Sequence, residues 1–313
     1  MSAYPIDRKL VIGIASSALF DLSESDKIYQ EKGIVEYRKF QESHLDTVLK
    51  KGVAFPFIRR FLSLNNAFPE QQPVEVVLLS KNSPETGLRV FNSIKHYGLD
   101  ITRAAFFSGK SPFKYIDAFN ASLFLSANSD DVRNAIDVGF PAGQVIETEI
   151  EDDEQDLELR LAFDFDGVII DDEAEEVYKT TGDLDEFNKN ETEKVRKPHN
   201  PGPLSDLFQK IAFFQKLEEK KSQLDPNYKP ILKTSIVTAR SAPAHERMIN
   251  TLKKWEINVD EAFFLGGIEK ARFLKVLKPH MYFDDQTVHL KKINNIPMVH
   301  IPFGISNNMP IKS

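Results

Sequence analysis

Cysteine is absent from this sequence, and its absence excludes disulfide bonds, thiolate metal sites and cysteine nucleophiles. Long apolar runs are absent as well: no run is long enough to cross a bilayer, and the opening MSAYPIDRK has no apolar signal core. Basic residues are not in excess, because 40 lysines and arginines face 47 aspartates and glutamates, for a net charge of −7. The sequence therefore predicts a cytoplasmic protein that binds neither a nucleic acid polymer nor a membrane.

The residues that are present are typical of a globular α/β protein. The 313 residues are 41% hydrophobic and 28% charged, which suits a chain with a large core and two domains. Predicted strands alternate with predicted helices, and this order favours parallel sheets covered on both faces. The strands are predicted at 9–15, 74–79, 104–107, 121–125, 161–170, 234–238, 262–265 and 280–283. The helices are predicted at 23–49, 55–62, 84–97, 130–138, 204–217, 244–255 and 270–277.

An acidic stretch separates the two halves of this pattern. Residues 147–160 are rich in aspartate and glutamate, and such a run is typical of a solvated linker. We therefore predict one domain at 1–146 and a second at 161–313. In the second domain a polar segment, 171–203, separates the first strand from the next helix.

The two halves share the order of their elements and their apolar pattern, which indicates an internal repeat. Setting Ser80 over Thr238 aligns a helix and three strands, and near the start Leu10 falls on Leu161. Any two α/β halves are somewhat alike, but one register that serves several elements favours a true duplication. The second half has chemical groups at Asp164, Asp166, Lys270, Asp284 and Asp285, where the first half has Gly13, Ala15, Pro112, Ser126 and Ala127. The first half is therefore predicted to be a degenerate copy without catalytic residues.

Two aspartates leave the end of the predicted strand 161–170, LAFDFDGVII. Asp164 and Asp166 stand two residues apart, so both leave the strand on the same face. Two carboxylates in apolar surroundings are costly unless a cation lies between them, and a magnesium ion with a phosphate ester meets that need. One aspartate is then suited to attack phosphorus and the other to handle the proton of the leaving alcohol. The alternative is a pair of acids that only caps the next segment.

Groups suited to phosphate follow two later strands. Thr238 ends a strand, and its hydroxyl together with the next backbone N–H, that of Ala239, is suited to hold a phosphate oxygen. Lys270, or Lys275 on the same predicted helix, is suited to neutralise phosphoryl charge. Taken singly, the threonine also fits plain β propensity and either lysine also fits a solvated charge.

A second acidic pair ends the last predicted strand. Asp284 and Asp285 would complete a magnesium site with Asp164 and Asp166, because Mg²⁺ prefers oxygen ligands. The alternative is a helix N-cap. In a parallel sheet all of these strand ends lie on one edge, where α/β proteins bind ligands, so the ordered set is more specific than its parts.

This ordered set resembles the haloacid dehalogenase superfamily of phosphotransferases. DFDGV from Asp164 matches the nucleophile signature, and Thr238, Lys270 and the pair Asp284–Asp285 match the three motifs that follow. Over nearly its whole length the sequence is also similar to the cytosolic type I 5′-nucleotidases. The stretches that carry this similarity are ALF at 18–20, AFPFI at 54–58, NSIKHY at 92–97, TARSAPAHER at 238–247, DEAFFLGG at 260–267 and FDDQ at 283–286.

The resemblance implies two tandem Rossmann-like halves of the haloacid dehalogenase type, with parallel sheets, a degenerate first half and a small cap at about 171–203. It implies magnesium-dependent hydrolysis of nucleoside 5′-monophosphates, with AMP as a usual substrate. Asp164 would be the phosphorylated nucleophile. Asp166 would be the acid/base and would also give a backbone carbonyl to the metal, with Asp285 binding the metal directly and Asp284 supporting it.

Further substrate contacts are predicted in and near the cap segment. Phe187 and Tyr178 are able to stack on a base, and Asp172 is able to touch the ribose. Arg240, two residues after Thr238, is another predicted substrate contact. The alternatives are that the aromatic residues pack the cap's own small core and that Asp172 caps a helix.

Three functions are compatible with these residues. The first is a magnesium-dependent 5′-nucleotidase, the second a related phosphatase for another small phosphomonoester, and the third a nucleotide-binding regulator on the same scaffold. A regulator would not need both Asp164 and Asp166, which favours an enzyme. The sequence leaves the base and sugar preference, any effector and homo-oligomerisation open.

Overall fold

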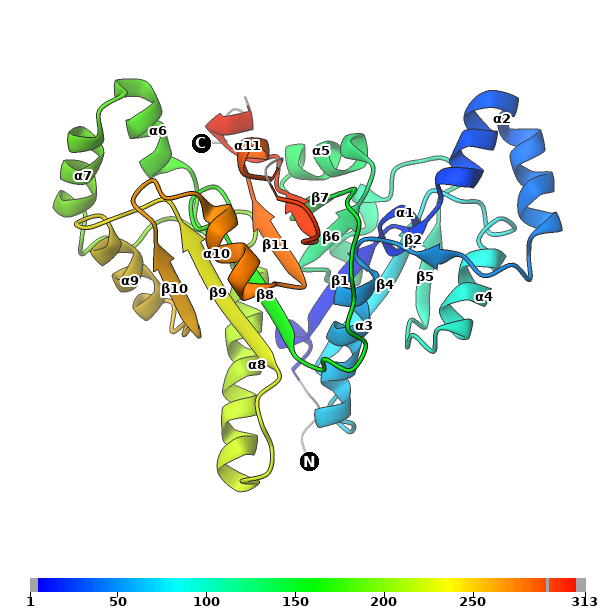
Figure 1. Ribbon diagram of the computed structural model, residues 1–313, viewed down its shortest axis with the longest axis horizontal. Helices are drawn as coiled ribbons and strands as arrows, with labels where there is room; N and C mark the ends of the chain where they lie inside the picture. The colour runs from blue at the N-terminus through cyan, green and yellow to red at the C-terminus, as the bar shows by residue number, and fades with distance from the viewer. Residues whose placement is uncertain (1–4, 291–292, 308–313) are drawn as a thin grey trace. The chain divides into compact units, whose positions relative to one another are not determined.

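The computed structural model describes residues 5–290 and 293–307. The chain divides into two compact units, Met1–Glu147 and Thr148–Ser313. Each unit is built from strands alternating with helices (Figure 1). The predicted α/β class is therefore confirmed.

The first unit contains a parallel sheet in the order β5-β4-β1-β6-β7. A separate antiparallel pair joins β2 and β3. The strands are β1 (Leu10–Ile14), β2 (Phe20–Asp21), β3 (Lys50–Lys51), β4 (Val74–Ser80), β5 (Arg103–Phe106), β6 (Leu123–Ser126) and β7 (Ala142–Ile146). The helices are α1 (Ser16–Leu19), α2 (Ser23–Ser43), α3 (Phe55–Ser63), α4 (Leu88–His96) and α5 (Ser129–Asp137), with 3₁₀ helices η1 (Ile6–Arg8), η2 (Leu64–Ala67), η3 (Phe113–Tyr115) and η4 (Asp117–Phe119).

The second unit contains a parallel sheet in the order β10-β9-β8-β11-β12. Its strands are β8 (Leu159–Phe163), β9 (Leu232–Thr238), β10 (Glu261–Phe264), β11 (Met281–Asp284) and β12 (Met298–His300). Its helices are α6 (Glu173–Thr181), α7 (Leu184–Glu193), α8 (Ser205–Leu224), α9 (His245–Lys254), α10 (Lys270–Leu277) and α11 (Thr287–Leu290), with the 3₁₀ helix η5 (Ile305–Asn307).

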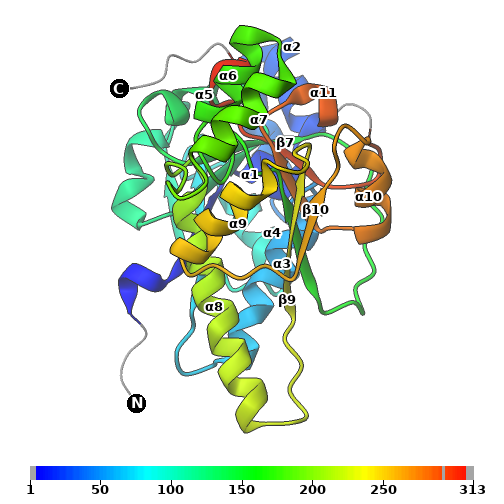
Figure 2. The same cartoon turned by 90° about the vertical axis from the view of Figure 1, so that its left-hand side faces the viewer.

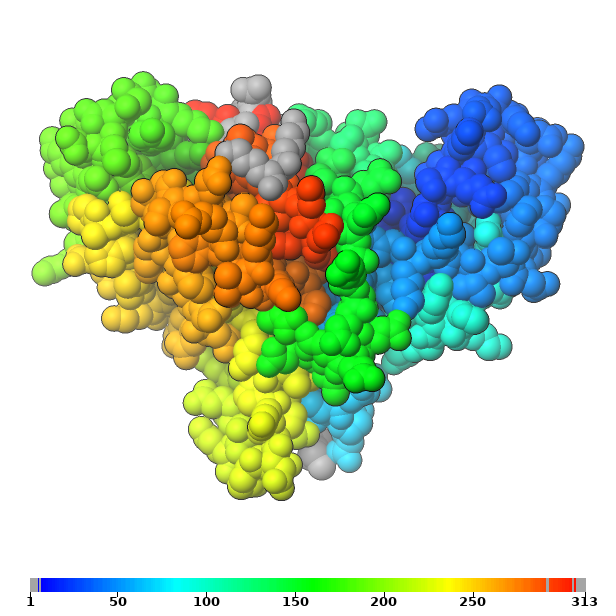
Figure 3. Space-filling view, in the orientation of Figure 1, coloured from blue at the N-terminus to red at the C-terminus, as the bar shows by residue number. Residues whose placement is uncertain are grey.

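Helices cover the second sheet on both faces. Figure 2 shows α8 and α9 on one side of β9 and β10, and α10 on the other. The helices α6 and α7 form a pair beyond the carboxyl ends of these strands (Figure 1), and we call this pair the cap. In the space-filling view the cap projects as a green lobe at the upper left (Figure 3). The carboxyl edge of the second sheet therefore faces a helical cover.

Aromatic packing fixes the strand that precedes the first acidic pair. Phe163 ends β8, is fully buried, and stacks on Phe283 of β11 with ring centroids 4.8 Å apart. Phe208 of α8 packs edge-on against the same ring at 4.9 Å. Each such aromatic contact adds about 0.5–1.5 kcal/mol beyond the burial of apolar area. The main chain that delivers Asp164 is therefore held by well-packed neighbours.

Two predictions about the strands need correction. The predicted strand 161–170 ends at Phe163, because Gly167 has φ +68, in the left-handed region, and turns the chain away from the sheet. The strands β7 and β12, each the last strand of its unit, were not predicted. They read AGQVI and MVH, and segments this short give little periodic signal.

The same strand order occurs in both units, but the predicted register of the repeat is wrong near its start. The N–H of Ala15 donates to the carbonyl of Leu125, and the N–H of Asp164 donates to that of Phe283, both at 2.8 Å. Leu125 and Phe283 coincide in the repeat alignment. Ala15, rather than Gly13, therefore stands at the position of Asp164. The predicted pairing of Asp164 was wrong by two residues, and Ala15 is not the counterpart of Asp166.

Candidate active site

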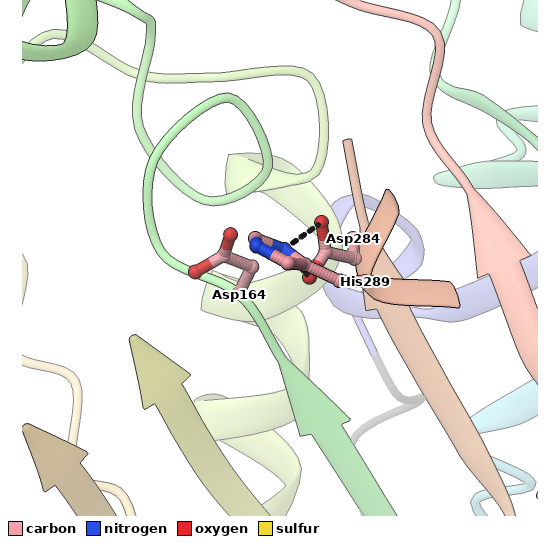
Figure 4. Close-up of side chains that lie close together, drawn as sticks. All are labelled: Asp164, Asp284 and His289. Atoms are coloured by element: carbon pink, nitrogen blue, oxygen red, sulfur yellow. Dashed lines mark hydrogen bonds and ion pairs between the residues drawn. The ribbon is translucent and has the colours of Figure 1, made fainter. Parts of the chain in front are cut away.

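Asp164 lies directly after β8 and is 4% exposed. Its Oδ1 accepts a hydrogen bond from the N–H of Phe165 at 2.8 Å, and its Oδ2 lies 2.6 Å from Nζ of Lys270. Figure 4 shows Asp164 beside Asp284 and His289, which come from β11 and α11. The carboxyl end of β8 thus meets the carboxyl end of β11, as expected from a parallel pair.

Lys270 joins the two acidic motifs. Its ammonium group also lies 2.8 Å from Oδ2 of Asp284, and its side chain is almost fully buried. Burial alone would lower the pKa of Lys270, but the charges of Asp164 and Asp284 outweigh it and raise that pKa. Lys275, the alternative phosphate lysine, is exposed. The structure therefore brings Lys270, and not Lys275, to Asp164.

Asp284 is fully occupied by protein partners. Its oxygens receive hydrogen bonds from the Tyr282 hydroxyl and from the N–H of Gln286 at 2.8 Å, and Nδ1 of His289 lies at 3.0 Å. Burial would raise the pKa of Asp284, yet Lys270 and His289 lower it below its usual range. Asp284 is thus a charged anchor for Lys270.

Asp285 is the opposite case, because neither of its oxygens has a hydrogen-bond partner although the residue is only 1% exposed. Burial and the nearby charges of Asp284 and Asp164 raise its pKa well above the usual range. A buried carboxylate without a partner is costly. A Cβ added at Gly167 would lie 2.9 Å from this carboxylate, so the glycine leaves the space that Asp285 needs.

The donor set fits a divalent cation. Asp164, Asp284 and His289 place candidate ligand atoms within 4.8 Å of one another, but Lys270 already lies between the two aspartates. Ionised Asp164, Asp284 and Asp285 against one ammonium leave two net negative charges, the amount that Mg²⁺ neutralises. The orphaned oxygens of Asp285 are therefore the better candidate ligands, because hard oxygen donors are what Mg²⁺ prefers.

The threonine motif lies on the neighbouring strand. Thr238 ends β9, which pairs with β8, and its Oγ1 accepts a hydrogen bond from the N–H of Arg240 at 3.2 Å. Thr238 is buried, whereas Ala239 is exposed. The strand end thus presents the backbone of Ala239 at the edge where Asp164 emerges.

Arg240 is held inside the protein. It is 4% exposed, and its Nη2 and Nε contact Oδ1 and Oδ2 of Asp166 at 2.6 and 2.8 Å. Its guanidinium lies 5.4 Å from the ring centroid of Phe165 and 5.3 Å from that of Phe187. The structure thus brings Phe187 of the cap to this site, on the face of an arginine. A fork of two hydrogen bonds fixes the orientation of the Asp166 carboxylate.

Asp172 has a different environment from the one predicted for a ribose contact. It is buried, and its Oδ2 accepts a hydrogen bond from the N–H of Ile305 at 2.6 Å. A Cβ added at Gly304 would lie 2.7 Å from the same oxygen. In this structure the carboxylate holds the segment around Gly304.

Sequence reasoning missed Glu191, which lies in the last turn of α7. Glu191 is 1% exposed and binds Nη1 of Arg240, Nη1 of Arg247 at 2.7 Å and Nε2 of His199 at 3.1 Å. Burial would raise the pKa of Glu191, but His199 and Arg240 outweigh it and lower that pKa to about 2. The acid stands in a polar run without periodicity, so no pattern singled it out.

The arrangement combines a buried carboxylate, a buried ammonium, an orphaned carboxylate and an oriented second acid at one sheet edge. Such a set is suited to nucleophilic attack on an anionic centre, because the positive charge of Lys270 lies beside the attacking oxygen. The described residues include no helix that is both long and apolar enough to cross a membrane.

Comparisons with known proteins point to one family. A family model described as 5′-nucleotidase matches residues 2–308. Human cytosolic 5′-nucleotidase 1B is 33% identical to the chain over 290 residues. That alignment covers 90% of the chain but 47% of the human protein, so the chain spans about half the length of this relative. No solved structure gives a significant match.

Proposed function

Because the chain belongs to the 5′-nucleotidase family, we propose that it is a magnesium-dependent hydrolase that converts nucleoside 5′-monophosphates to nucleoside and phosphate. The observation that carries the proposal is the carboxylate of Asp164 at 2.6 Å from Lys270, beside the unpartnered carboxylate of Asp285. The name of the human relative supports the same substrate class.

The reaction would proceed in two displacements. A carboxylate oxygen of Asp164 attacks phosphorus, the bond from phosphorus to the 5′ oxygen breaks, and Asp166 gives its proton to that oxygen. Water then attacks the aspartyl phosphate, Asp166 takes the proton from the water, and the Asp164 carboxylate is released together with inorganic phosphate. The chemistry that Mg²⁺ supplies when bound is the neutralisation of phosphoryl and carboxylate charge.

The other groups have supporting roles in this proposal. Lys270 offsets charge on the nucleophile and the phosphoryl oxygens, while Thr238 and the backbone of Ala239 hold a phosphoryl oxygen. Asp285, Asp164 and the backbone carbonyl of Asp166 would hold Mg²⁺, with Asp284 fixing Lys270 rather than binding the metal.

The proposal extends to the domain organisation. We infer two tandem Rossmann-like halves of the haloacid dehalogenase type, at 1–146 and 161–313, joined by the acidic linker 147–160. The identical strand order of the two units supports a duplication, and the cap helices lie within the predicted segment 171–203. The first half would be degenerate, since alanine stands where the nucleophile is in the second. The cytoplasmic location is proposed on the name of the human relative.

A phosphate-release screen with Mg²⁺ tests the proposed function. The panel contains nucleoside 5′-monophosphates, sugar phosphates and p-nitrophenyl phosphate. We expect the highest kcat/KM with a nucleoside 5′-monophosphate. A higher value with a sugar phosphate would favour the alternative phosphatase, and nucleotide binding without phosphate release would favour the regulator.

Replacing Asp166 by Asn should lower turnover of a nucleoside 5′-monophosphate by about 10²–10⁴-fold, the usual contribution of a positioned acid or base. Asparagine keeps the size of the side chain but cannot donate and recover the proton. Steady-state phosphate release measures the effect, and a thermal melt checks that the variant is folded. Unchanged turnover in the folded variant would mean that another group transfers the proton.

A further inference from the structure

Asp166 is oriented through a chain of contacts that begins on the cap. Nε and Nη2 of Arg240 form the fork that holds Asp166, and the remaining nitrogen, Nη1, pairs with Oε2 of Glu191 at the end of α7. The Glu191 and Arg240 side chains are almost completely buried, while that of Asp166 is 16% exposed. The chain of contacts therefore runs from a buried cap acid to the predicted catalytic acid.

The position of Arg240 depends on Glu191 for an electrostatic reason. The fork to Asp166 fixes the guanidinium and that carboxylate relative to each other, and a second carboxylate on another edge of the guanidinium fixes both relative to the cap. Removing one partner from a buried charged pair is strongly destabilising, because it leaves the other charge without compensation. The guanidinium of Arg240 also lies over the rings of Phe165 and Phe187, 5.4 and 5.3 Å from their centroids. Glu191 thus sets the plane in which Arg240 presents its fork.

The first unit provides an internal comparison, because its hydrogen bonds repeat those of the second. Nε of Arg89 donates to the carbonyl of Thr47 at 2.9 Å, just as Nε of Arg247 donates to the carbonyl of Lys197 at 3.0 Å. Nη1 of Arg89 reaches Oε1 of Gln41 at 3.5 Å, so Gln41 stands where the second unit has Glu191. In the first unit α2 is interrupted by a kink at Gly33 (φ 78), so its two parts correspond to the cap helices α6 and α7. The contacts that attach this pair of helices to α4 in one unit and to α9 in the other therefore recur.

The contacts from Glu191 through Arg240 to Asp166 do not recur in the first unit. The carbonyl of Asn82 accepts from the N–H of Ser108 at 3.1 Å, just as the carbonyl of Arg240 accepts from that of Gly266 at 3.2 Å. Asn82 therefore takes the place of Arg240, and its side chain binds the hydroxyl of Tyr37 at 3.0 Å. The charged side chains of Glu191 and Arg240 are thus replaced by the neutral amides of Gln41 and Asn82 in the first unit, which lacks the acidic pair.

We propose that Glu191 is a positioning residue that acts through Arg240 to hold Asp166 in the orientation needed for proton transfer to the leaving group. This inference rests on the proposed phosphatase function and adds to it a condition: the cap must be seated for the acid to be oriented. Glu191 does not touch the reacting atoms, so its effect should appear in the proton-transfer step and not in phosphate binding.

The test compares two leaving groups in the full chain with Mg²⁺. Release of a nucleoside alkoxide needs a proton, whereas p-nitrophenolate leaves with little help, because its charge is delocalised. For Glu191→Gln we expect kcat/KM for a nucleoside 5′-monophosphate to fall by about tenfold or more, within the roughly 10²-fold cost of a small misplacement. The kcat/KM for p-nitrophenyl phosphate should change far less, so the ratio of the two values should fall.

Glu173→Gln is the matched control. Glu173 also lies on the cap and also pairs with Arg247, at 3.2 Å, but its other partner is Lys194, at 2.6 Å. It therefore contributes to cap attachment without contacting Arg240. We expect the ratio of the two kcat/KM values in Glu173→Gln to match the wild type. An equal fall in both variants would show that cap attachment alone is responsible and would overturn the proposal.

Two further variants keep the test decisive. In an Arg240→Gln background, adding Glu191→Gln should not change the ratio of the two kcat/KM values further. Glu191 acts through Arg240, so its replacement has no effect once Arg240 is absent. If Glu191→Gln does not fold, Glu191→Asp replaces it and should give a smaller fall. An unchanged ratio in a folded Glu191 variant overturns this inference alone. A wild-type protein that releases phosphate from neither ester overturns the proposed function itself.

Discussion

Replacing Asp164 by Asn should lower phosphate release from a nucleoside 5′-monophosphate by about 10⁴–10⁶-fold, the scale on which removal of a covalent nucleophile acts. Asparagine keeps the size of the side chain but has no negative charge with which to attack phosphorus. It also gives up the ion pair with Lys270 at 2.6 Å. Burial raises the pKa of Asp164 to about 7, with Lys270 opposing the rise, so the neutral amide should be well tolerated by the fold.

Steady-state release measures the loss, and mass spectrometry of acid-quenched wild-type protein should find phosphate on the peptide that contains Asp164. Asp206→Asn serves as the control, because this aspartate is on α8, pairs only with Lys210 in the described residues and is largely exposed. The control should release phosphate at the wild-type rate. Release by Asp164→Asn within about tenfold of the wild type would remove Asp164 from the role of nucleophile.

Chelation of Mg²⁺ should abolish turnover, and Asp285→Asn should reproduce that loss in the presence of the metal. Loss of a hydrogen-bond partner of a metal ligand typically weakens metal binding by about 10–100-fold. Loss of Asp285, a direct ligand, should weaken Mg²⁺ binding by more than that. The Asp285→Asn variant should also show that the lost turnover comes from lost metal binding and not from unfolding. Both oxygens of Asp285 are buried without partners, so the neutral amide should raise the melting temperature of the metal-free protein.

The measurement is a set of melts with and without Mg²⁺, alongside phosphate release. Mg²⁺ should raise the melting temperature of the wild type, because a ligand that binds only the folded state stabilises it. It should have no such effect on Asp285→Asn. Full turnover after exhaustive chelation, or the same metal-dependent shift in the variant, would contradict the proposed ligand set.

The strands were predictable wherever an apolar run was long. The alignment of the first strand of one unit with that of the other was not, because shifts by two residues could not be told apart. Sliding β1 by two residues against β8 keeps every side chain on its own face of the sheet. The apolar patterns LVIGI and LRLAF therefore fit either alignment. Hydrogen bonds between strands, such as that from Ala15 to Leu125, carry the information that the pattern lacks.

The polar groups after the strands were predictable because a parallel sheet gathers its carboxyl ends on one edge. This reasoning found Asp164, Lys270 and Asp285, whose proximity follows from topology. It did not find Glu191, because its place beside Arg240 follows from the way the cap folds back onto the core. For the same reason it assigned Arg240 to the substrate, while in the structure the guanidinium of Arg240 is paired with the carboxylates of Asp166 and Glu191.

Chain length distinguishes the two units at the turn that follows the central strand. The N–H of Ala54 donates to the carbonyl of Ala18, as the N–H of Leu204 donates to that of Val168. Two residues separate Ala15 from Ala18, whereas three separate Asp164 from Val168. The turn of the first unit thus has no place for a counterpart of the whole Phe165–Gly167 segment. Point substitutions that placed acids in the first unit would therefore not reproduce the geometry of the second, and an inserted residue would be needed as well.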